Sequence, residues 1–120
     1  MAAARDPQIV LEQMLEAILD IGQMTASRSF ETYAADRPLR RAVERCIEII
    51  SEPSLRLPPD LKDRHPAIPW QKIAGIGNVL RHDYDAVNNT TIWHAATFDL
   101  PPLKTLVETL LHEIQADQAN

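Results

Sequence analysis

The sequence predicts an all-α fold, an up-and-down antiparallel bundle of about five helices. Three observations support this prediction. Several segments carry apolar residues at helical spacing, and none shows the period-two alternation of a half-buried strand. Capping residues and prolines stand at the starts of these segments, where helices favour them. The chain has only 3 glycines in 120 residues, which disfavours a hairpin-rich β fold.

The first predicted helix begins at Asp6 as N-cap, with Pro7 as the first helical residue. It is expected to end near Gly22. Its apolar positions recur at i, i+3, i+4 and i+7 and are Leu11, Met14, Leu15, Ile18 and Ile21. A short helical turn is expected to open at Ser29 and to run through Tyr33.

The next predicted helix begins at Asp36 or Arg37, followed by Pro38. The residues expected to face the core are Leu39, Val43, Cys46, Ile47 and Ile50. Pro53 is expected to kink or end this helix, because proline removes a backbone donor and clashes with the preceding turn. Prolines over residues 57–60 then break the chain before a short turn at Leu61.

Pro69 and Trp70 open a further helix. Its apolar positions are Ile73, Ile76, Leu80 and, if the helix continues, Tyr84. Residues 88–90 form a break and cap before a helix with apolar positions Ile92, Trp93, Ala96 and Phe98. Residues 101–102, both proline, are expected to kink or restart the chain, and the last helix to run from Leu103 to about Ala116.

The composition bounds the class of protein. With 45% apolar and 24% charged residues, the chain suits one globular domain over residues 1–120. The single cysteine, Cys46, excludes a disulfide framework and a multi-cysteine zinc site, and its place among the core positions disfavours a nucleophile. No stretch is apolar for long enough to span a membrane, and the start lacks the pattern of a secretory signal. A cytoplasmic location is therefore expected.

The net charge of −5 hides a division along the chain. Residues 1–36 carry 2 basic and 6 acidic side chains, residues 37–82 carry 9 and 5, and residues 83–120 carry 1 and 6. The overall sign argues against a protein that coats nucleic acid without specificity. The basic middle favours either a solvated mixed-charge face or a local surface for an anionic ligand, and charge alone favours the first. Its basic residues are Arg37, Arg40, Arg41, Arg45, Arg56, Lys62, Arg64, Lys72 and Arg81.

The end of the Trp70 helix holds the residues most suited to chemistry. Asn78 and His82 are four positions apart and share a face. His82 lies about 200° of helical turn from Leu80, which places it off the apolar stripe. Spacing alone leaves two alternatives open, a site or interface and a solvated surface. A histidine can act as general base or acid near neutral pH, and the adjacent Arg81 can neutralise charge on a phosphoryl group. These two roles suit cleavage of a phosphodiester by an internal hydroxyl.

No metal site is expected, because His65, His94 and His112 lack the spacing of metal ligands. An ordered set of short segments along nearly the whole chain instead resembles the HepT-like toxins of the HEPN superfamily, found in HEPN/MNT toxin–antitoxin pairs. The segments are residues 5–7, 29–30, 41–45, 49–52, 57–58, 65–66, 68–70, 73–84, 92–93 and 99–103.

The resemblance implies a helical bundle that forms a homodimer, with its site in a cleft between the protomers. It implies a metal-independent endoribonuclease that needs no cofactor and cleaves RNA by attack of the 2′-hydroxyl. It also implies a nucleotidyltransferase antitoxin as partner, which silences some members by adenylylating a tyrosine. The family motif is arginine, a polar residue, three residues and histidine, then one residue and tyrosine. Asn78, His82 and Tyr84 match it, and Tyr84 is the modification candidate.

The motif arginine is replaced by Gly77. Arg81 stands one turn later, and helical side chains lean toward the N-terminus, so Arg81 is expected to reach back over a space that glycine leaves empty. In this hypothesis His82 handles the proton, Arg81 stabilises the phosphorane, Asn78 orients substrate or His82, and basic residues steer RNA. The steering residues are Arg37, Arg41 and Arg45.

Two alternatives remain open from the sequence. The loss of the motif arginine favours a catalytically inactive module that dimerises and binds a nucleotidyltransferase or a nucleotide. A helical scaffold without a ligand is the third interpretation. RNA cleavage distinguishes the enzyme from both, and binding of a partner or nucleotide distinguishes the module from the scaffold.

Overall fold

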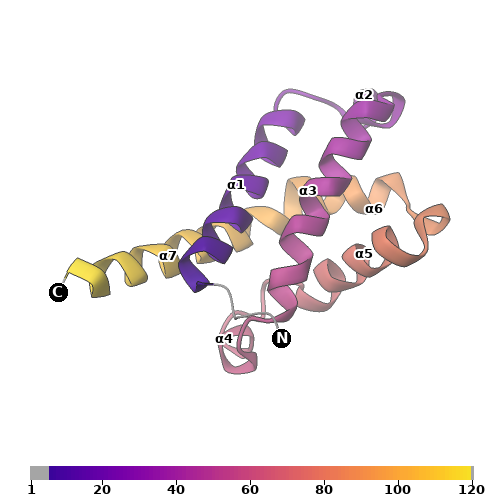
Figure 1. The fold of residues 1–120 in the computed structure, drawn as a ribbon. Helices are drawn as coiled ribbons and strands as arrows, with labels where there is room; N and C mark the ends of the chain where they lie inside the picture. Colours follow the sequence, from indigo (N-terminus) through magenta and orange to yellow (C-terminus); the bar gives the residue numbers. More distant parts are fainter. Residues whose placement is uncertain (1–5, 120) are drawn as a thin grey trace.

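A computed structural model describes residues 6–119, which form an all-α fold (Figure 1). Residues 1–5 and 120, and with them Arg5 at the start of the family resemblance, lie outside the described part. Over residues 6–119 there is no strand, which confirms the predicted fold class. The elements are α1 (Pro7–Thr25), α2 (Phe30–Ala35), α3 (Arg37–Leu55), α4 (Pro59–Asp63), α5 (Trp70–His82), the 3₁₀ turn η1 (Tyr84–Ala86), α6 (Asn89–His94), the π-helical segment η2 (Ala95–Asp99) and α7 (Leu100–Ala119).

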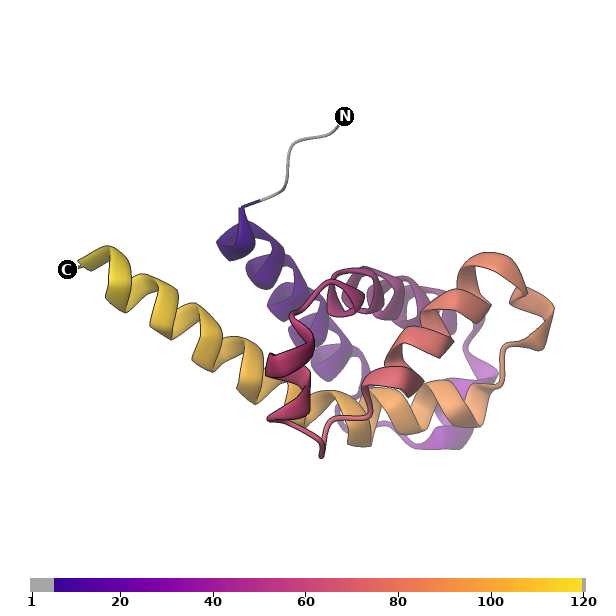
Figure 2. The same ribbon diagram turned by 90° about the horizontal axis from the view of Figure 1, so that it is seen from below.

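Helix α3 is the centre of the arrangement, because it packs against both α1 and α5. Helices α1 and α3 run side by side in opposite directions (Figure 1). Helix α7 packs against α1, and its C-terminal half extends away from the other helices (Figure 2). The structure is therefore elongated, with principal extents of 49 × 34 × 27 Å. None of the helices in the described range is long and apolar enough to cross a membrane.

Four of the predicted helix starts are confirmed by their caps. Asp6, Ser29, Asp36 and Asn88 each accept a hydrogen bond from a backbone N–H two or three residues later. Such a bond satisfies one of the donors that a helix leaves without a partner at its first turn. Local sequence therefore determines where α1, α2, α3 and α6 begin.

The cap of α3 allows a direct stability prediction. The Oδ1 atom of Asp36 accepts from the backbone N–H of Leu39 at 3.1 Å. Replacing Asp36 with alanine is expected to lower the free energy of unfolding by about 0.5–2 kcal/mol, because the first turn loses this acceptor. Urea unfolding measures the change. Asp36→Asn keeps a capping oxygen and should retain most of the stability, and an equal loss in both variants would contradict the capping role.

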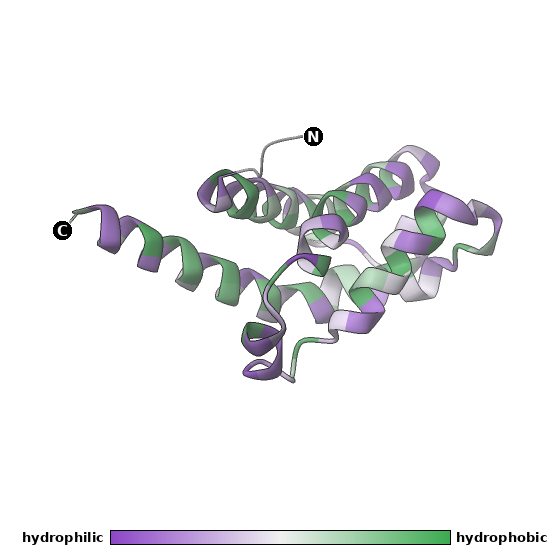
Figure 3. Ribbon diagram, turned by 60° about the horizontal axis from the view of Figure 1, so that its bottom comes forward, coloured by the Kyte–Doolittle hydropathy of each residue, from purple (hydrophilic) through white to green (hydrophobic). Residues whose placement is uncertain are grey.

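Most positions of the predicted apolar stripes are buried in, or packed against, a common core, and Figure 3 shows these apolar residues along the helices. The side chains of α5 that were expected inside, at Ile73, Ile76 and Leu80, are at most 8% exposed. Cys46 is partly buried and packs against this core, and burial raises the pKa of its thiol. The largest fully buried side chains are Met14, Ile21, Tyr33, Ile47, Ile50, Ile73, Ile92, Leu100 and Leu103.

Two helix ends differ from the prediction. Helix α1 continues through Gly22 to Thr25, because glycine weakens a helix without ending it. Of the two expectations for Pro53, a kink or an end of the helix, the second is wrong, because α3 continues through Pro53 to Leu55. Pro53 lies in the last turn of α3. Proline removes one backbone hydrogen bond, and only two helical residues follow it, so the loss is tolerated.

The last helix also begins earlier than predicted, at Leu100 rather than Leu103, and it runs to Ala119. Residues 101–102 lie in its first turn without breaking it. The π-helical segment directly before them was not predicted, and the two prolines lack the backbone N–H groups that an α-helix would donate to carbonyls of this segment. Phe98 in this segment is 68% exposed and does not contribute to the core.

Candidate functional site

Helix α5 places the predicted catalytic residues on one exposed face. Because Ile73, Ile76 and Leu80 are buried, the helix cannot rotate about its axis without exposing apolar surface. Asn78 and His82 consequently point away from the core and are exposed, as their spacing predicted. At 100° per residue, Asn78, Arg81 and His82 span about 100° of arc.

The helix ends directly after this face. His82 is its last residue, and Asp83 leaves the helical conformation with φ −151° and ψ 59°. Arg81 and His82 therefore occupy the last turn, where the helix dipole favours positive charge. Within residues 6–119 the side chains of Asn78 and His82 have no hydrogen-bond or ion-pair partner, so both are free to contact a ligand or a second chain.

Arg81 leans back along α5 toward Gly77, as predicted. One guanidinium nitrogen donates to Ser51 Oγ at 3.4 Å and lies 3.8 Å from Glu52 Oε2. Its side chain is 28% exposed, and Glu52 also pairs with Arg56 at 2.8 Å. Arg81 is thus held against α3, with Glu52 offsetting part of its charge.

The reason expected for Gly77 is wrong, because the space beside it is not empty. A Cβ atom added at Gly77 would lie 1.9 Å from Ser51 Oγ and 2.6 Å from Ser51 Cβ, while Arg81 is 3.2 Å away. Ser51 is fully buried, so α3 occupies the space beside Gly77. Glycine is required here because two helix backbones approach closely.

Tyr84 turns away from the apolar stripe of α5 to which its spacing assigned it. It belongs to η1 and is 50% exposed, which agrees with the alternative that α5 ends near Asp83. Its hydroxyl donates to Glu44 Oε1 at 2.6 Å. This hydrogen bond, burial and the charge of Glu44 raise the pKa of Tyr84, and Arg41 beside the hydroxyl acts in the opposite direction.

The three predicted steering residues, Arg37, Arg41 and Arg45, are exposed and follow one another at i, i+4 and i+8 along α3. Arg41 links this row to Tyr84. The other basic residues do not all converge on the same place. Arg40 donates to a backbone carbonyl, Lys62 lies near two carbonyls at the end of α3, and Lys72 pairs elsewhere.

Two polar residues beside the site, Glu44 and Ser51, were missed from the sequence. They are 5% and 0% exposed and share a buried stripe of α3 with Ile47 and Ser54, at spacings of 3, 4 and 3 residues. Polar residues in the register of a buried stripe were the signal that could have identified them. Ser51 accepts a hydrogen bond from Arg81 of α5, and Glu44 accepts one from Tyr84 of η1.

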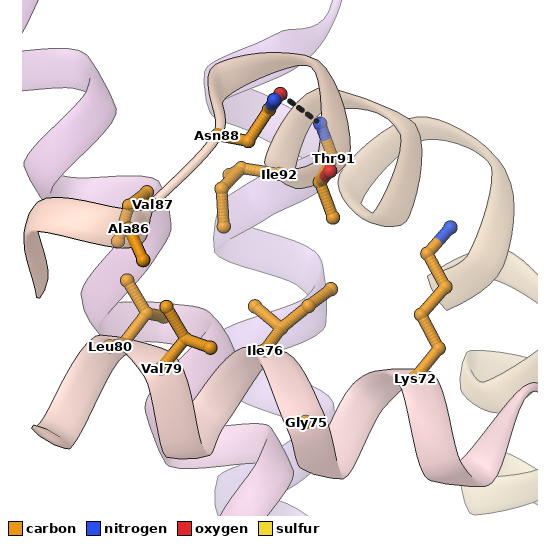
Figure 4. Close-up of a pocket in the computed structure, with 10 residues that line it drawn as sticks. All are labelled: Lys72, Gly75, Ile76, Val79, Leu80, Ala86, Val87, Asn88, Thr91 and Ile92. Carbon is orange, nitrogen blue, oxygen red and sulfur yellow. Dashed lines mark hydrogen bonds between the residues drawn. The ribbon is translucent and has the colours of Figure 1, made fainter. Parts of the chain in front are cut away.

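A cavity of about 380 Å³ lies between α5, η1 and α6 (Figure 4). Its wall is mostly apolar, and neither Asn78, Arg81 nor His82 lines it. At one end Lys72 contacts the buried Asp99 at 2.5 Å and His94 at 2.8 Å. This polar group joins α5 to η2. In the described part of the chain no cluster of three or more His, Cys, Asp or Glu side chains could hold a metal ion.

Comparison with known proteins shows the family to which the chain belongs. Residues 14–110 match the family "Ribonuclease HepT-like". The chain is 38% identical over 100 residues to "Probable ribonuclease HepT" of Thermococcus cleftensis, an alignment covering 83% of this chain and 91% of that protein. It is 30% identical over 116 residues to "Putative RNase MJ1216" of Methanocaldococcus jannaschii, covering 97% and 96%. No solved structure matches. The chain therefore belongs to the HepT-like ribonuclease family.

Proposed function

We propose that this protein is the toxin of a HEPN/MNT-type toxin–antitoxin pair and acts in the cytoplasm as a metal-independent endoribonuclease. The observation that carries the proposal is the exposed face of α5, which presents Asn78, Arg81 and His82 in a chain of the HepT-like family. Relatives with matching length bear the names of ribonucleases. RNA is the substrate in this proposal.

The reaction is transesterification within RNA. The 2′-oxygen forms a bond to phosphorus, the bond from phosphorus to the 5′-oxygen breaks, and a cyclic phosphate results. His82 handles the proton of the attacking hydroxyl or of the leaving group. Arg81 stabilises the charge of the phosphorane, and Asn78 orients the substrate or His82. Neither a metal nor a cofactor takes part in these steps.

The active form is a homodimer in this proposal, with the site in a cleft between protomers. Exposed Asn78 and His82 are available to such a cleft. The row Arg37, Arg41 and Arg45 steers the RNA backbone, since exposed arginines attract phosphates over a distance of about 10 Å at moderate salt. The partner that silences the enzyme is a nucleotidyltransferase antitoxin, and half-exposed Tyr84 is its modification target.

Purified protein in the presence of EDTA should cleave single-stranded RNA and leave 2′,3′-cyclic phosphate ends. The products can be identified by their resistance to phosphomonoesterase and by mass spectrometry. Cleavage that requires added Mg²⁺, or products with a 3′-hydroxyl end, would contradict the proposed mechanism.

A second function is favoured by the positions of Gly77 and Arg81. The motif arginine is absent, and the arginine nearest to it is bound to Ser51 and near Glu52. An inactive module that dimerises and binds a nucleotidyltransferase or a nucleotide fits these contacts. A dimer that binds its partner but does not cleave RNA at any salt concentration would support the module over the enzyme.

A further inference from the structure

The hydroxyl of Tyr84 lies in an environment suited to removing its proton. Tyr84 is the first residue of η1, and the sharp end of α5 at Asp83 turns its ring back toward α3. There the hydroxyl donates to Glu44 Oε1 at 2.6 Å, a short distance typical of a hydrogen bond to a carboxylate. The residue as a whole remains 50% exposed, so Tyr84 is open to a reagent from solvent while its hydroxyl is bonded to the carboxylate.

Glu44 is an unusual residue for a helix interface. It is 5% exposed and lies on the face of α3 that packs against the core, where carboxylates are rare unless they have a partner. Its surroundings are mixed in charge. Arg40 and Arg41 lie on its own helix, and the buried hydroxyl of Tyr33 is close enough to be influenced by its charge. Among the described residues, that Tyr33 hydroxyl has no hydrogen-bond partner.

We propose that Glu44 is the general base that activates Tyr84 for modification. This inference rests on the proposed function, in which Tyr84 accepts a nucleotidyl group from a nucleoside triphosphate. Glu44 contacts the reacting oxygen itself. The proton acceptor for Tyr84 is therefore supplied by this chain and not by the transferase that binds it.

The Tyr84 oxygen forms a bond to the α-phosphorus, the bond from that phosphorus to the bridging oxygen breaks, and pyrophosphate leaves. The phenolic proton passes to Glu44 Oε1. Because the phenol is held neutral until attack begins, transfer of the proton accompanies formation of the new bond.

The buried position of Glu44 suits a carboxyl group that is protonated after Tyr84 has been modified. Once modified, the Tyr84 oxygen can no longer donate to Glu44. An ionised Glu44 would then lose its partner in a buried position, which is costly, whereas a protonated Glu44 is neutral. The same transfer that activates Tyr84 thus removes the buried charge that modification would leave behind.

The proposal can be tested without a partner protein by using N-acetylimidazole, which acetylates accessible tyrosines. In that reaction the base takes the phenolic proton as the phenolic oxygen bonds to the acetyl carbon. The bond from that carbon to the imidazole nitrogen breaks, and the leaving nitrogen takes up a proton from water to give imidazole. At neutral pH, Glu44→Gln should lower the rate of acetylation at Tyr84 by about 10²-fold, the low end of the contribution of a positioned base. Peptide mapping by mass spectrometry locates the acetyl group, and lysine acetylation in the same sample calibrates the reagent.

If Glu44 contributes to packing alone, the rate of Tyr84 acetylation should rise in Glu44→Gln instead of falling. Glutamine removes the charge that raises the pKa of Tyr84, so phenolate should be more abundant and the tyrosine less restrained. Equal or faster acetylation of Glu44→Gln would therefore overturn the proposal. If Glu44→Gln does not fold, Glu44→Asp keeps a base at a greater distance and should give an intermediate rate, and a wild-type rate there would overturn it as well.

Two controls separate this result from the proposed function. Tyr33→Phe removes the buried hydroxyl and should leave acetylation of Tyr84 near the wild-type rate. RNA cleavage is measured in the same preparations, because acetylation requires neither RNA nor a nucleotidyltransferase. Absence of RNA cleavage in the wild type would contradict the ribonuclease, whereas unchanged acetylation in Glu44→Gln would contradict the role of Glu44.

Discussion

Replacing His82 with alanine is expected to lower the rate of RNA cleavage by about 10²–10⁴-fold, the usual contribution of a general acid or base. The effect should appear in kcat rather than in RNA affinity, because the imidazole handles a proton during the reaction. Stability should change little. His82 is exposed at the end of α5 and has no side-chain partner in the described part of the chain.

The matched control is His112→Ala. His112 is also an exposed histidine on a helix, but it lies on α7, away from α5. Cleavage is followed with a labelled single-stranded RNA in EDTA, and folding by circular dichroism. If His82→Ala and His112→Ala cleave as rapidly as the wild type, His82 has no part in the chemistry.

Replacing Gly77 with alanine is expected to lower the free energy of unfolding by about 1–3 kcal/mol, the typical cost of overpacking a core. The added Cβ would lie 2.6 Å from Ser51 Cβ, and both atoms are attached directly to their backbones. Side-chain rotation cannot relieve this contact, so α3 and α5 must move apart. Alanine also favours the helix by up to about 1 kcal/mol, which offsets part of the loss.

Gly75→Ala is the control for Gly77→Ala, because Gly75 lies two residues away on the same helix and the substitution is identical. A Cβ added there meets nothing within 4 Å, so Gly75→Ala should stabilise the protein by about 0.5–1 kcal/mol. Combining Gly77→Ala with Ser51→Gly should restore more stability than the two single effects predict, as measured by urea unfolding. Additive effects in this double-mutant cycle would show that Ser51 is not the obstacle.

This contact also changes how Arg81 must be tested. Gly77→Arg in a chain that keeps Ser51 would disturb the interface between α3 and α5. A loss of activity in that variant would reflect the disturbed packing and not the role of the arginine. Ser51→Gly is therefore a necessary companion of Gly77→Arg. Arg81→Ala by itself leaves the interface between Gly77 and Ser51 in place and is the more informative single change.

Local features of the fold were predictable because their causes are local. Asp36 caps α3 through a hydrogen bond that spans three residues, and Ile73, Ile76 and Leu80 face the core because a helix repeats every 3.6 residues. The exposure of His82 follows from the same periodicity. The continuation of α3 through Pro53 was not predicted, because a proline within the last turn of a helix removes a hydrogen bond without ending the helix there.

By itself, the sequence determined the helical class, the starts of α1, α3 and α5, and the face of α5 that presents Asn78 and His82. Only the tertiary structure decided why residue 77 is glycine, what holds Arg81 and where the Tyr84 hydroxyl points. Ser51 and Gly77 are 26 positions apart, and Glu44 and Tyr84 are 40 apart. These contacts depend on how closely α3 and α5 approach and how each is rotated. Periodicity along one helix specifies its buried face, but the partner that meets that face is set by packing between helices.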